Sequence, residues 1–255
     1  MMSFSDIHSH IIYGVDDGAK TIQDSLAMLD IALGSGTTDI VASPHASGKY
    51  YFDPVTVEQR LSELRRLSPI RIHPGCDFHL QSDNIEDAVK NPEKYTINHR
   101  CYLLVEFSNV GTLHGAGAML DRLLEAGMVP VITHPERHSL LQQRTDDLAD
   151  WVSRGSLVQV TAGSHTGLFG RRVQSSAQDL LKRGLTHFIA SDAHDCKVRR
   201  PSLKEAYEQL ADDWGEDAIR PLFVDNPRAA IDGEPLEFEF APAISKARKW
   251  YQFWG

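Results

Sequence analysis

The sequence predicts a single α/β domain built on parallel strands, and two observations carry this prediction. An amphipathic helix, a glycine and a short apolar run recur together, around Gly36, Gly127, Gly155 and Gly184. Glycine just past a helix end adopts the left-handed conformation that turns the chain back toward a sheet. The runs that follow are rich in β-branched residues and apolar throughout, which is typical of parallel strands covered on both faces. The alternation favours a barrel or a doubly wound layer, without choosing between them.

Seven strands are expected in chain order, with helices between most of them. The first spans residues 3–10, and Thr21 and Asp24 stand at capping-box spacing at the start of the next helix, 21–33. The second strand spans 37–45 and precedes a helix near 57–67 with apolar residues at helical spacing. The other strands are expected at 70–78, 101–108, 128–136, 156–164 and 185–194.

Composition excludes several classes of protein. The 255 residues carry a net charge of -9, which argues against nucleic acid as the main partner. No run resembles a signal peptide or a transmembrane segment, so we expect a cytoplasmic protein. The three cysteines (Cys76, Cys101, Cys196) form no CxxC pair, which indicates neither a disulfide frame nor a thiolate zinc site.

The end of the chain differs in composition from the rest. No Ser/Gly-rich or Pro-rich linker is present, so residues 1–232 are predicted to form one barrel domain. Residues 233–255 are aromatic and locally basic, with Trp250 and Trp254 close together. We expect this tail to pack on the barrel or on a partner subunit, and the sequence is compatible with a homo-oligomer.

Polar side chains mark the C-terminal ends of the expected strands. Residues two apart in a strand project to the same face, so a His-x-His or Asp-x-His pair points together. In barrels and open α/β sheets alike, functional sites assemble at this edge. Six of the seven strands carry such residues: His8 and His10, His45, Asp77, Glu106, His134, and Asp192 with His194.

This set of residues predicts a metal site. Glu106 lies in an otherwise apolar run, where a carboxylate needs a cation, several hydrogen bonds or a proton. Imidazole and carboxylate ligands without thiolate suit Mn, Fe, Zn, Mg or Co alike, and of these we expect Mn. Because the candidates outnumber the ligands of one ion, we expect two or three divalent metals, an arrangement that promotes phosphoryl displacement.

Several motifs resemble a known family. The segments DIHSH at 6–10, GVDDGAKT at 14–21, ASPH at 42–45, HPER at 134–137 and ASDAH at 190–194 follow one another in the order typical of PHP-superfamily metallophosphoesterases. The DDGAKT and HPER segments are similar to those of the bacterial capsular and exopolysaccharide protein-tyrosine phosphatase branch. The resemblance covers roughly residues 4 to 205 and implies a single-domain distorted (β/α)7 barrel with three metal ions.

The resemblance also implies roles for individual residues. Asp17 is expected to face the metals, whereas the neighbouring Asp16 is expected to make local hydrogen bonds in a turn. Arg137 and Arg200 are expected to bind phosphate and, with Asp192, to be catalytic, because arginine offers a fixed fork of donors. The implied metal ligands are His8, His10, Asp17, His45, Asp77, Glu106, His134, Asp192 and His194.

Three features depart from that pattern or leave a choice open. Asp77 stands where the family usually has the longer Glu, so its part in the cluster is in question. Arg199 and Arg200 compete for one phosphate-binding role. The aromatic run at 49–52 is either a wall for a phenyl phosphate or a loop with packed aromatics.

The hypothesis is hydrolysis of phosphotyrosine in proteins by a metal-activated hydroxide, without a phosphoenzyme. No cysteine is followed by an arginine six residues later, so the Cys-x5-Arg motif is absent. This excludes a cysteine-dependent phosphatase. The leaving phenolate needs little protonation, although His138 or a metal-bound water is a candidate acid. The resemblance implies the tyrosine-rich tail of a polysaccharide-export kinase as substrate. The alternatives are a small-molecule phosphatase, acting on histidinol phosphate or a nucleotide, and a metal-binding scaffold with weak catalysis.

Overall fold

The computed structural model describes residues 3–108 and 113–236, and within them it has the expected parallel strands. Most of the predicted C-terminal tail, from residue 237, lies outside the described residues. Every strand pairing is parallel. The strands are β1 (Phe4–Ser9), β2 (Thr37–Ala42), β3 (His45–Ala46), β4 (Arg71–Pro74), β5 (Asp77–His79), β6 (Tyr102–Glu106), β7 (Val129–Thr133), β8 (Leu157–Thr161) and β9 (Phe188–Ala190).

Two of the seven expected strands are interrupted. Pro44, which has no N–H to donate, separates β2 from β3, and Gly75 with Cys76 separates β4 from β5. The pieces pair with different neighbours, which divides the strands into a β1-β2-β4 sheet and a β3-β5-β6-β7-β8-β9 sheet. The interruptions therefore bend the sheet where it curves into a barrel.

The barrel closes at the C-terminal edge of its strands. A parallel bridge joins Ser9, at the end of β1, to Ala193, just after β9. The N–H of His10 donates to the carbonyl of Ala193 at 2.8 Å, and the N–H of Asp192 donates to the carbonyl of His8 at 2.9 Å. These hydrogen bonds lie between the two segments that carry the HxH and DxH pairs. The predicted α/β fold with parallel strands is confirmed, and its barrel-like curvature agrees with what the family resemblance implies.

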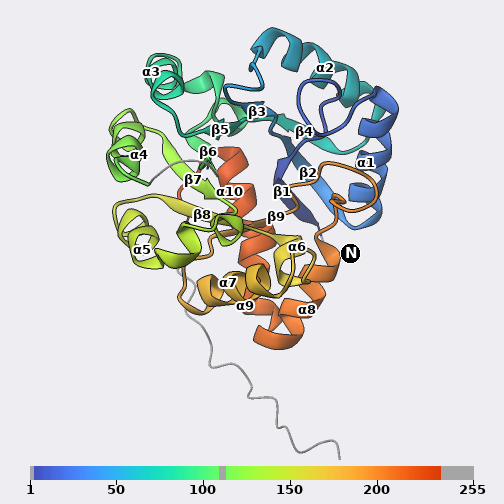
Figure 1. The fold of residues 1–255 in the computed structure, drawn as a ribbon. Helices are drawn as coiled ribbons and strands as arrows, with labels where there is room; N and C mark the ends of the chain where they lie inside the picture. Colours follow the sequence, from blue (N-terminus) through green and yellow to red (C-terminus); the bar gives the residue numbers. More distant parts are fainter. Residues whose placement is uncertain (1–2, 109–112, 237–255) are drawn as a thin grey trace, which may run out of the picture.

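Helices surround the strands on the outside (Figure 1). The capping box predicted at Thr21 and Asp24 is present at the start of the first helix. The α-helices are α1 (Ile22–Gly34), α2 (Pro54–Leu67), α3 (Ser82–Lys90), α4 (Ala116–Glu125), α5 (Thr145–Ser153), α6 (Ala162–His165), α7 (Arg171–Lys182), α8 (Lys204–Trp214), α9 (Glu216–Arg220) and α10 (Asn226–Asp232). Short 3₁₀ helices are η1 (Pro92–Lys94), η2 (Ile97–His99), η3 (Pro135–Arg137) and η4 (Leu141–Gln143), and η5 (Pro221–Asp225) is a π-helix. None of the helices in the described part of the chain is long and apolar enough to cross a membrane.

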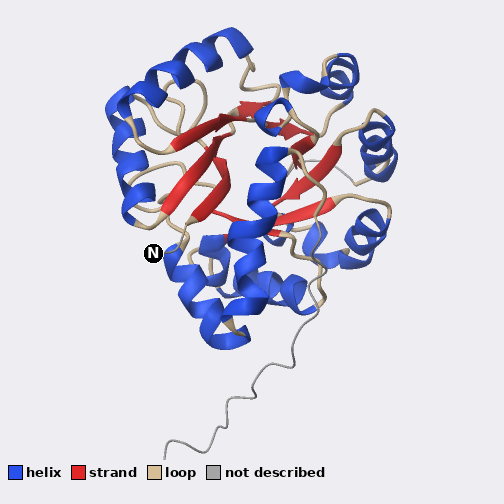
Figure 2. Ribbon diagram, turned by 180° about the vertical axis from the view of Figure 1, so that it is seen from behind, coloured by secondary structure: helices blue, strands red, loops and turns tan. Residues whose placement is uncertain are grey.

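One end of the barrel is filled by apolar side chains and covered by α10. Figure 2, which views the molecule from behind, shows this helix across the front of the strands. Its Ala230 and Ile231 pack in one cluster with Val41, Leu104 and Val131. Side chains two residues apart in a strand share a face. The side chains two positions further along these strands, toward the C-terminal ends, therefore also point into the barrel interior. The site thus has a solid apolar floor.

A buried carboxylate ties this floor to two strands. Asp39 of β2 is 2% exposed and accepts hydrogen bonds from Arg71 Nε at 2.7 Å and His73 Nε2 at 3.0 Å in β4. Arg228 of α10 lies 3.5 Å away. Burial alone would raise the pKa of Asp39, but His73 and Arg71 outweigh it and hold this pKa below its usual value.

Asp39→Asn should therefore lower the free energy of unfolding at pH 7 by about 1 to 3 kcal/mol. The pKa of Asp39 is lower in the folded chain than the value of about 3.9 expected for the unfolded chain, so its ionised carboxylate stabilises the fold above that pH. This contribution to the free energy of unfolding is lost as the pH falls. The difference between variant and parent should shrink on acidification from pH 7 to 3, as measured by urea denaturation. Asp213→Asn, at an exposed position of α8, is the control. Equal stability of Asp39→Asn and parent at pH 7 would refute the role.

Candidate metal centre

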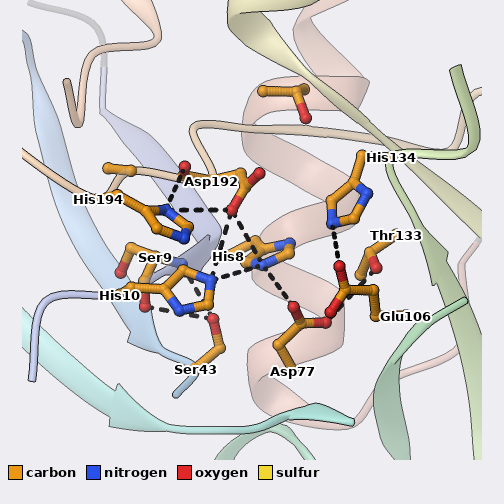
Figure 3. Close-up of polar contacts among 12 residues, drawn as sticks. His8, Ser9, His10, Ser43, Asp77, Glu106, Thr133, His134, Asp192 and His194 are labelled. Carbon is orange, nitrogen blue, oxygen red and sulfur yellow. Dashed lines mark hydrogen bonds and ion pairs between the residues drawn. The ribbon is translucent and has the colours of Figure 1, made fainter. Parts of the chain in front are cut away.

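The nine expected ligands all reach one place, the C-terminal edge of the barrel. Figure 3 shows the part of this cluster formed by His8, His10, Asp77, Glu106, His134, Asp192 and His194. Their donor atoms form four overlapping groups, and within each group the atoms lie within 4.8 Å of one another. The groups share several members because the cluster is compact. They are His10, Asp17, His45 and His194; His8, Asp77 and His134; His8, His10 and Asp192; and His45, Glu106 and a further histidine, His79.

His8 in β1 and His10 just after it present the same ring nitrogen to the centre. The Nε2 atoms of His8 and His10 lie 3.2 Å apart. The Nδ1 of His8 is 2.9 Å from Oε1 of Gln159, and the Nδ1 of His10 is 2.8 Å from Oδ2 of Asp16. Because these partners accept hydrogen bonds, they favour the tautomer whose Nε2 is free to bind a metal.

The adjacent residues Asp16 and Asp17, which follow β1, have different roles. Asp16 is buried, and beyond its bond to His10 it accepts from the N–H of His45 at 3.1 Å and of Gly18 at 2.9 Å. Asp17 is half-exposed, with Oδ1 at 3.3 Å from His45 Nε2. A Cβ at Gly18 would lie 2.1 Å from the carbonyl oxygen of His10, so only glycine fits there. Asp16 thus orients two expected ligands, a larger role than the local turn contacts expected of it.

Asp192 lies at the centre of the site. Its Oδ1 is 3.4 Å from Nε2 of both His8 and His10. Its Oδ2 accepts from Arg137 and Arg199. Burial alone would raise the pKa of Asp192, but His8, His10 and the two arginines hold it well below its usual range. The carboxylate is therefore ionised and shared between the expected metal ligands and the arginines.

Two of the expected ligands have strained backbones. Asp192 has φ 48° and His134 has φ 36°, both in the left-handed region that non-glycine residues seldom adopt. Such strain costs about 1–3 kcal/mol and is typical of functional sites. Burial, reinforced by the charge of Arg137, lowers the pKa of His134 to about 3, so its ring is neutral and able to ligate at neutral pH.

The geometry favours one of the two competing arginines. Arg199 is part-buried and pairs with Asp192, whereas Arg200 is exposed. Both line a cavity of about 110 Å³ beside the cluster, together with Phe169. The guanidinium of Arg137 lies over the ring of Phe169, 4.5 Å from its centroid. The geometry therefore favours Arg199 over Arg200 at this side of Asp192, and the phosphate-binding role of either arginine stays a prediction.

Asp77 reaches the cluster despite its shorter side chain. It is fully buried, and its Oδ2 lies 3.1 Å from His45 Nδ1 and 3.5 Å from His8 Nε2. Burial lowers the pKa of His8, but the charges of Asp192 and Asp77 outweigh it and raise that pKa to about 9. Asp77 is held ionised as well, since His8 and His45 keep its pKa well below the usual value against its burial.

The donor set fits divalent cations. Among the described residues, His45 Nδ1, Asp77 Oδ2 and Glu106 Oε2 are buried without a hydrogen-bond partner, although they lie close to one another. Burial and the charge of Asp77 would raise the pKa of Glu106, but His45, His79 and His134 lower it to about 2. Ionised carboxylates this close together need positive charge between them, and imidazole with carboxylate suits Mn, Fe, Zn, Mg or Co.

Comparison with known proteins identifies the family. The family model for capsular polysaccharide synthesis, CpsB/CapC, matches residues 4–232. The chain belongs to the CpsB/CapC family. Its predicted resemblance to the capsular branch is thereby confirmed.

Relatives of this CpsB/CapC chain match over nearly their whole length. The tyrosine-protein phosphatase YwqE of Bacillus subtilis (strain 168) is 30% identical over 254 residues, covering 97% of this chain and 99% of YwqE. The tyrosine-protein phosphatase CpsB of Streptococcus pneumoniae is 30% identical over 237 residues, covering 89% of this chain and 97% of that protein.

One solved structure agrees with this family assignment, and another shares only the fold. A crystal structure from work on YwqE of B. subtilis and CpsB of S. pneumoniae, described there as metal-dependent tyrosine phosphatases, matches with a TM-score of 0.83 at 26% identity, over 95% of this chain and 99% of that chain. A β-aspartyl dipeptidase of Fervidobacterium islandicum AW-1 matches with a TM-score of 0.57 at 13% identity, over 94% of this chain and 78% of that chain, and it shares the fold alone.

Two residues of this CpsB/CapC site escaped the sequence analysis. His79 follows Asp77 at i+2, the same spacing as the pairs at the ends of β1 and β9, so a signal was present. Gln159 is a polar residue of β8, which corresponds to the expected strand without a His or carboxylate at its end. Its contact with His8 spans 151 positions of the chain and leaves no local pattern.

The structure of this CpsB/CapC chain bears on two further hypotheses: His138 as the general acid, and the aromatic run at 49–52 as a wall of the site. Both ring nitrogens of His138 are engaged, with Nε2 2.9 Å from the carbonyl of Ser108 and Nδ1 3.3 Å from the N–H of Leu141, which disfavours His138 as the acid. The ring of Tyr50 stacks on His45, with centroids 5.6 Å apart. One aromatic ring of the run at 49–52 thus lies at the edge of the cluster, whereas Phe52 packs against Tyr95 and Tyr51 is exposed.

Proposed function

We propose that this chain is a metal-dependent protein-tyrosine phosphatase. The observation that carries the proposal is the convergence of nine histidine and acidic donors on one edge of the barrel, with Arg137 and Arg199 on the same carboxylate, Asp192. The structural relative described as metal-dependent and the relatives named as tyrosine-protein phosphatases support it.

The chain's own residues account for binding of the phosphate. Arg137 and Arg199 hold their guanidinium groups against one oxygen of Asp192, so both donors are aimed at the cluster before substrate arrives. A phosphoryl group offers several acceptors to such forks, and charge-assisted hydrogen bonds of this kind are about twice as strong as neutral ones. Bound divalent ions would supply activated water and neutralise the developing charge.

Two aromatic rings contact residues of the site. Tyr50 stacks on His45, and Phe169 lies under Arg137. A phenyl ring attached to the phosphate would contact such surfaces favourably, through offset or edge-to-face packing. The phenolate leaving group has a pKa of about 10 and departs with little protonation, so the engagement of His138 in structural hydrogen bonds is compatible with the reaction.

The finer parts of the proposal concern the metals and the substrate. We propose two or three divalent ions, with Mn first among the candidates. The substrate we propose is the phosphotyrosine-bearing tail of a tyrosine kinase of polysaccharide biosynthesis or export. The family, defined by capsular polysaccharide synthesis, supports that choice.

The test is turnover after chelation, with Mn, Mg, Fe, Co or Zn added back singly. Para-nitrophenyl phosphate and a phosphotyrosyl peptide serve as substrates, and phosphoseryl peptide and histidinol phosphate as comparisons. We expect activity to disappear on chelation and to return with metal on both aryl substrates. Faster turnover of histidinol phosphate would instead indicate a metabolite phosphatase, and metal uptake without turnover of any ester would indicate a scaffold.

A further inference from the structure

A cavity lies directly beside the expected metal ligands. Its volume is about 110 Å³, well above the ~10–15 Å³ that a single water molecule needs. Ser191, the residue before Asp192, and Arg199, which pairs with Asp192, both line it. The ring of Phe169 lines it too and lies under the guanidinium group of Arg137. The cavity is therefore continuous with the residues that are proposed to bind the phosphate.

Two exposed apolar side chains line the same cavity. Leu168 is 44% exposed and Val198 is 64% exposed. They come from different segments, Leu168 from the turn between α6 and α7 and Val198 from the segment between β9 and α8. Single exposed apolar residues are normal on a protein surface, but apolar groups that gather at one cavity beside polar residues indicate a binding surface.

Backbone hydrogen bonds hold both of these side chains in place. The N–H of Leu168 donates to the carbonyl of Gly163 at 2.9 Å. The carboxylate of Asp195 accepts from the N–H groups of Lys197 and Val198, both at 2.6 Å. The two segments are thus fixed before a partner arrives, which lowers the conformational entropy that binding would cost.

A second cavity meets the first at Val198. It has a volume of about 420 Å³ and is also lined by Asp17 and His194, two of the expected metal ligands. Because Val198 lines both cavities, its side chain stands between them. A ligand that contacts the cluster can therefore extend to either side of Val198. A small phosphate ester would leave one of these spaces empty, whereas a peptide has residues on both sides of its phosphotyrosine.

The charges around the smaller cavity are balanced. Its charged lining residues are Arg199, which is paired with Asp192, and the exposed residues Arg200 and Glu205, which have opposite signs. No net charge therefore remains to select an ionic side chain. A small apolar side chain suits this cavity best, because it would remove the exposed apolar surface of the lining from water.

We propose that this cavity is a docking subsite for an apolar residue adjacent to phosphotyrosine in a substrate peptide, with Leu168 and Val198 as its specificity-determining residues. The inference rests on the proposed function and extends it from the phosphate to the residues that flank it. Because both side chains lie outside the set of expected ligands and arginines, they act on recognition of the peptide and not on the chemical step.

The first measurement compares four phosphotyrosyl peptides on the manganese-loaded protein. The peptides share an alanine background and carry glycine on both sides of phosphotyrosine, leucine before it, leucine after it, or leucine on both sides. We expect kcat/KM for the best leucine peptide to exceed that for the glycine peptide by about 10-fold. Leu168→Ser/Val198→Ser should reduce this preference to about twofold or less, with para-nitrophenyl phosphate as the reference for the chemical step.

The matched control is the double variant Leu33→Ser/Val89→Ser. Leu33 is 44% exposed and Val89 is 38% exposed, and they lie in the last turns of α1 and α3. These helices run back toward the start of the next strand, so both residues lie at the opposite edge of the barrel. The control should keep the preference of the parent protein for leucine.

Binding provides a second measurement that needs no turnover. The same four peptides are made with phosphonodifluoromethyl phenylalanine, a substitute for phosphotyrosine that cannot be hydrolysed, and their affinities are determined by fluorescence anisotropy. We expect the best leucine peptide to bind the parent and the control about 10-fold more tightly than the glycine peptide, and Leu168→Ser/Val198→Ser to lose that advantage. Val198→Thr, which keeps the shape of valine, provides the same test if the double variant does not fold.

The outcomes separate this proposal from the wider one. Equal affinity for glycine and leucine peptides would overturn it, as would a leucine preference that persists in Leu168→Ser/Val198→Ser. An equal loss of turnover on the peptides and on para-nitrophenyl phosphate in that variant would also overturn it. A parent protein that binds leucine peptides preferentially but hydrolyses no phosphate ester would instead overturn the proposed activity and leave the docking subsite intact.

Discussion

Asp192→Asn should lower kcat/KM for a phosphotyrosyl peptide by at least about 1,000-fold, the largest effect expected of any single substitution here. Asp192 contacts His8, His10, Arg137 and Arg199, so loss of its charge weakens metal binding and phosphate binding together. Asparagine is preferable to alanine in this test. The residue has φ 48°, a conformation that asparagine adopts readily and that costs other side chains about 1–2 kcal/mol.

The measurement for Asp192→Asn is steady-state kinetics with metal content determined on the same samples. Asp213→Asn, an exposed acid of α8, controls for a general effect of removing one negative charge. We expect reduced metal content and lost activity in Asp192→Asn and neither change in the control. Activity within tenfold of the parent, with metal retained, would remove Asp192 from the reaction.

Arg199→Ala should lower kcat/KM by about 100-fold, whereas Arg200→Ala should change it by about threefold at most. The two residues are adjacent in the sequence and identical in chemistry, so the pair is its own control. Arg199 pairs with Asp192 and is part-buried, while Arg200 is exposed. Arg199→Lys should recover only part of the loss, because lysine restores the charge but not the planar fork.

Inhibition by inorganic phosphate provides a second measurement on the same two variants. Weaker inhibition is expected in Arg199→Ala, since the guanidinium group is predicted to contact the phosphate itself. If Arg200→Ala shows the larger loss instead, the assignment of these two arginines is reversed and the cavity beside the cluster has to open further on substrate binding.

The fold could be predicted because its signals are local. Gly36, Gly127, Gly155 and Gly184 each precede an apolar run, and these runs are β2, β7, β8 and β9. The breaks at Pro44 and at Gly75 were not predicted as ends of strands, since each lies within a stretch that is otherwise suited to a strand. Only the curvature of the closed barrel requires the chain to change partners there.

The candidate ligands were predictable for a related reason. Parallel strands bring their C-terminal ends to one edge, so His8, His45, Glu106 and His134 had to meet wherever the sheet closed. Whether Asp77 reaches the cluster could be judged only from the structure, because one methylene decides whether a carboxylate contacts its neighbours. Its Oδ2 lies 3.1 Å from Nδ1 of His45, which removes the main hint toward a scaffold without catalysis.

The sequence by itself determined the fold class, the family and the edge at which the expected ligands gather, because strand order, helix ends and side-chain alternation are properties of neighbouring residues. Only the tertiary structure decided that Gln159 orients His8, that Arg199 and not Arg200 contacts Asp192, and that His79 joins Glu106. Such contacts depend on the register of distant strands and the direction of a loop. Register and loop direction are set by the packing of the whole barrel, and they leave no pattern in the local sequence that would show which side chains meet.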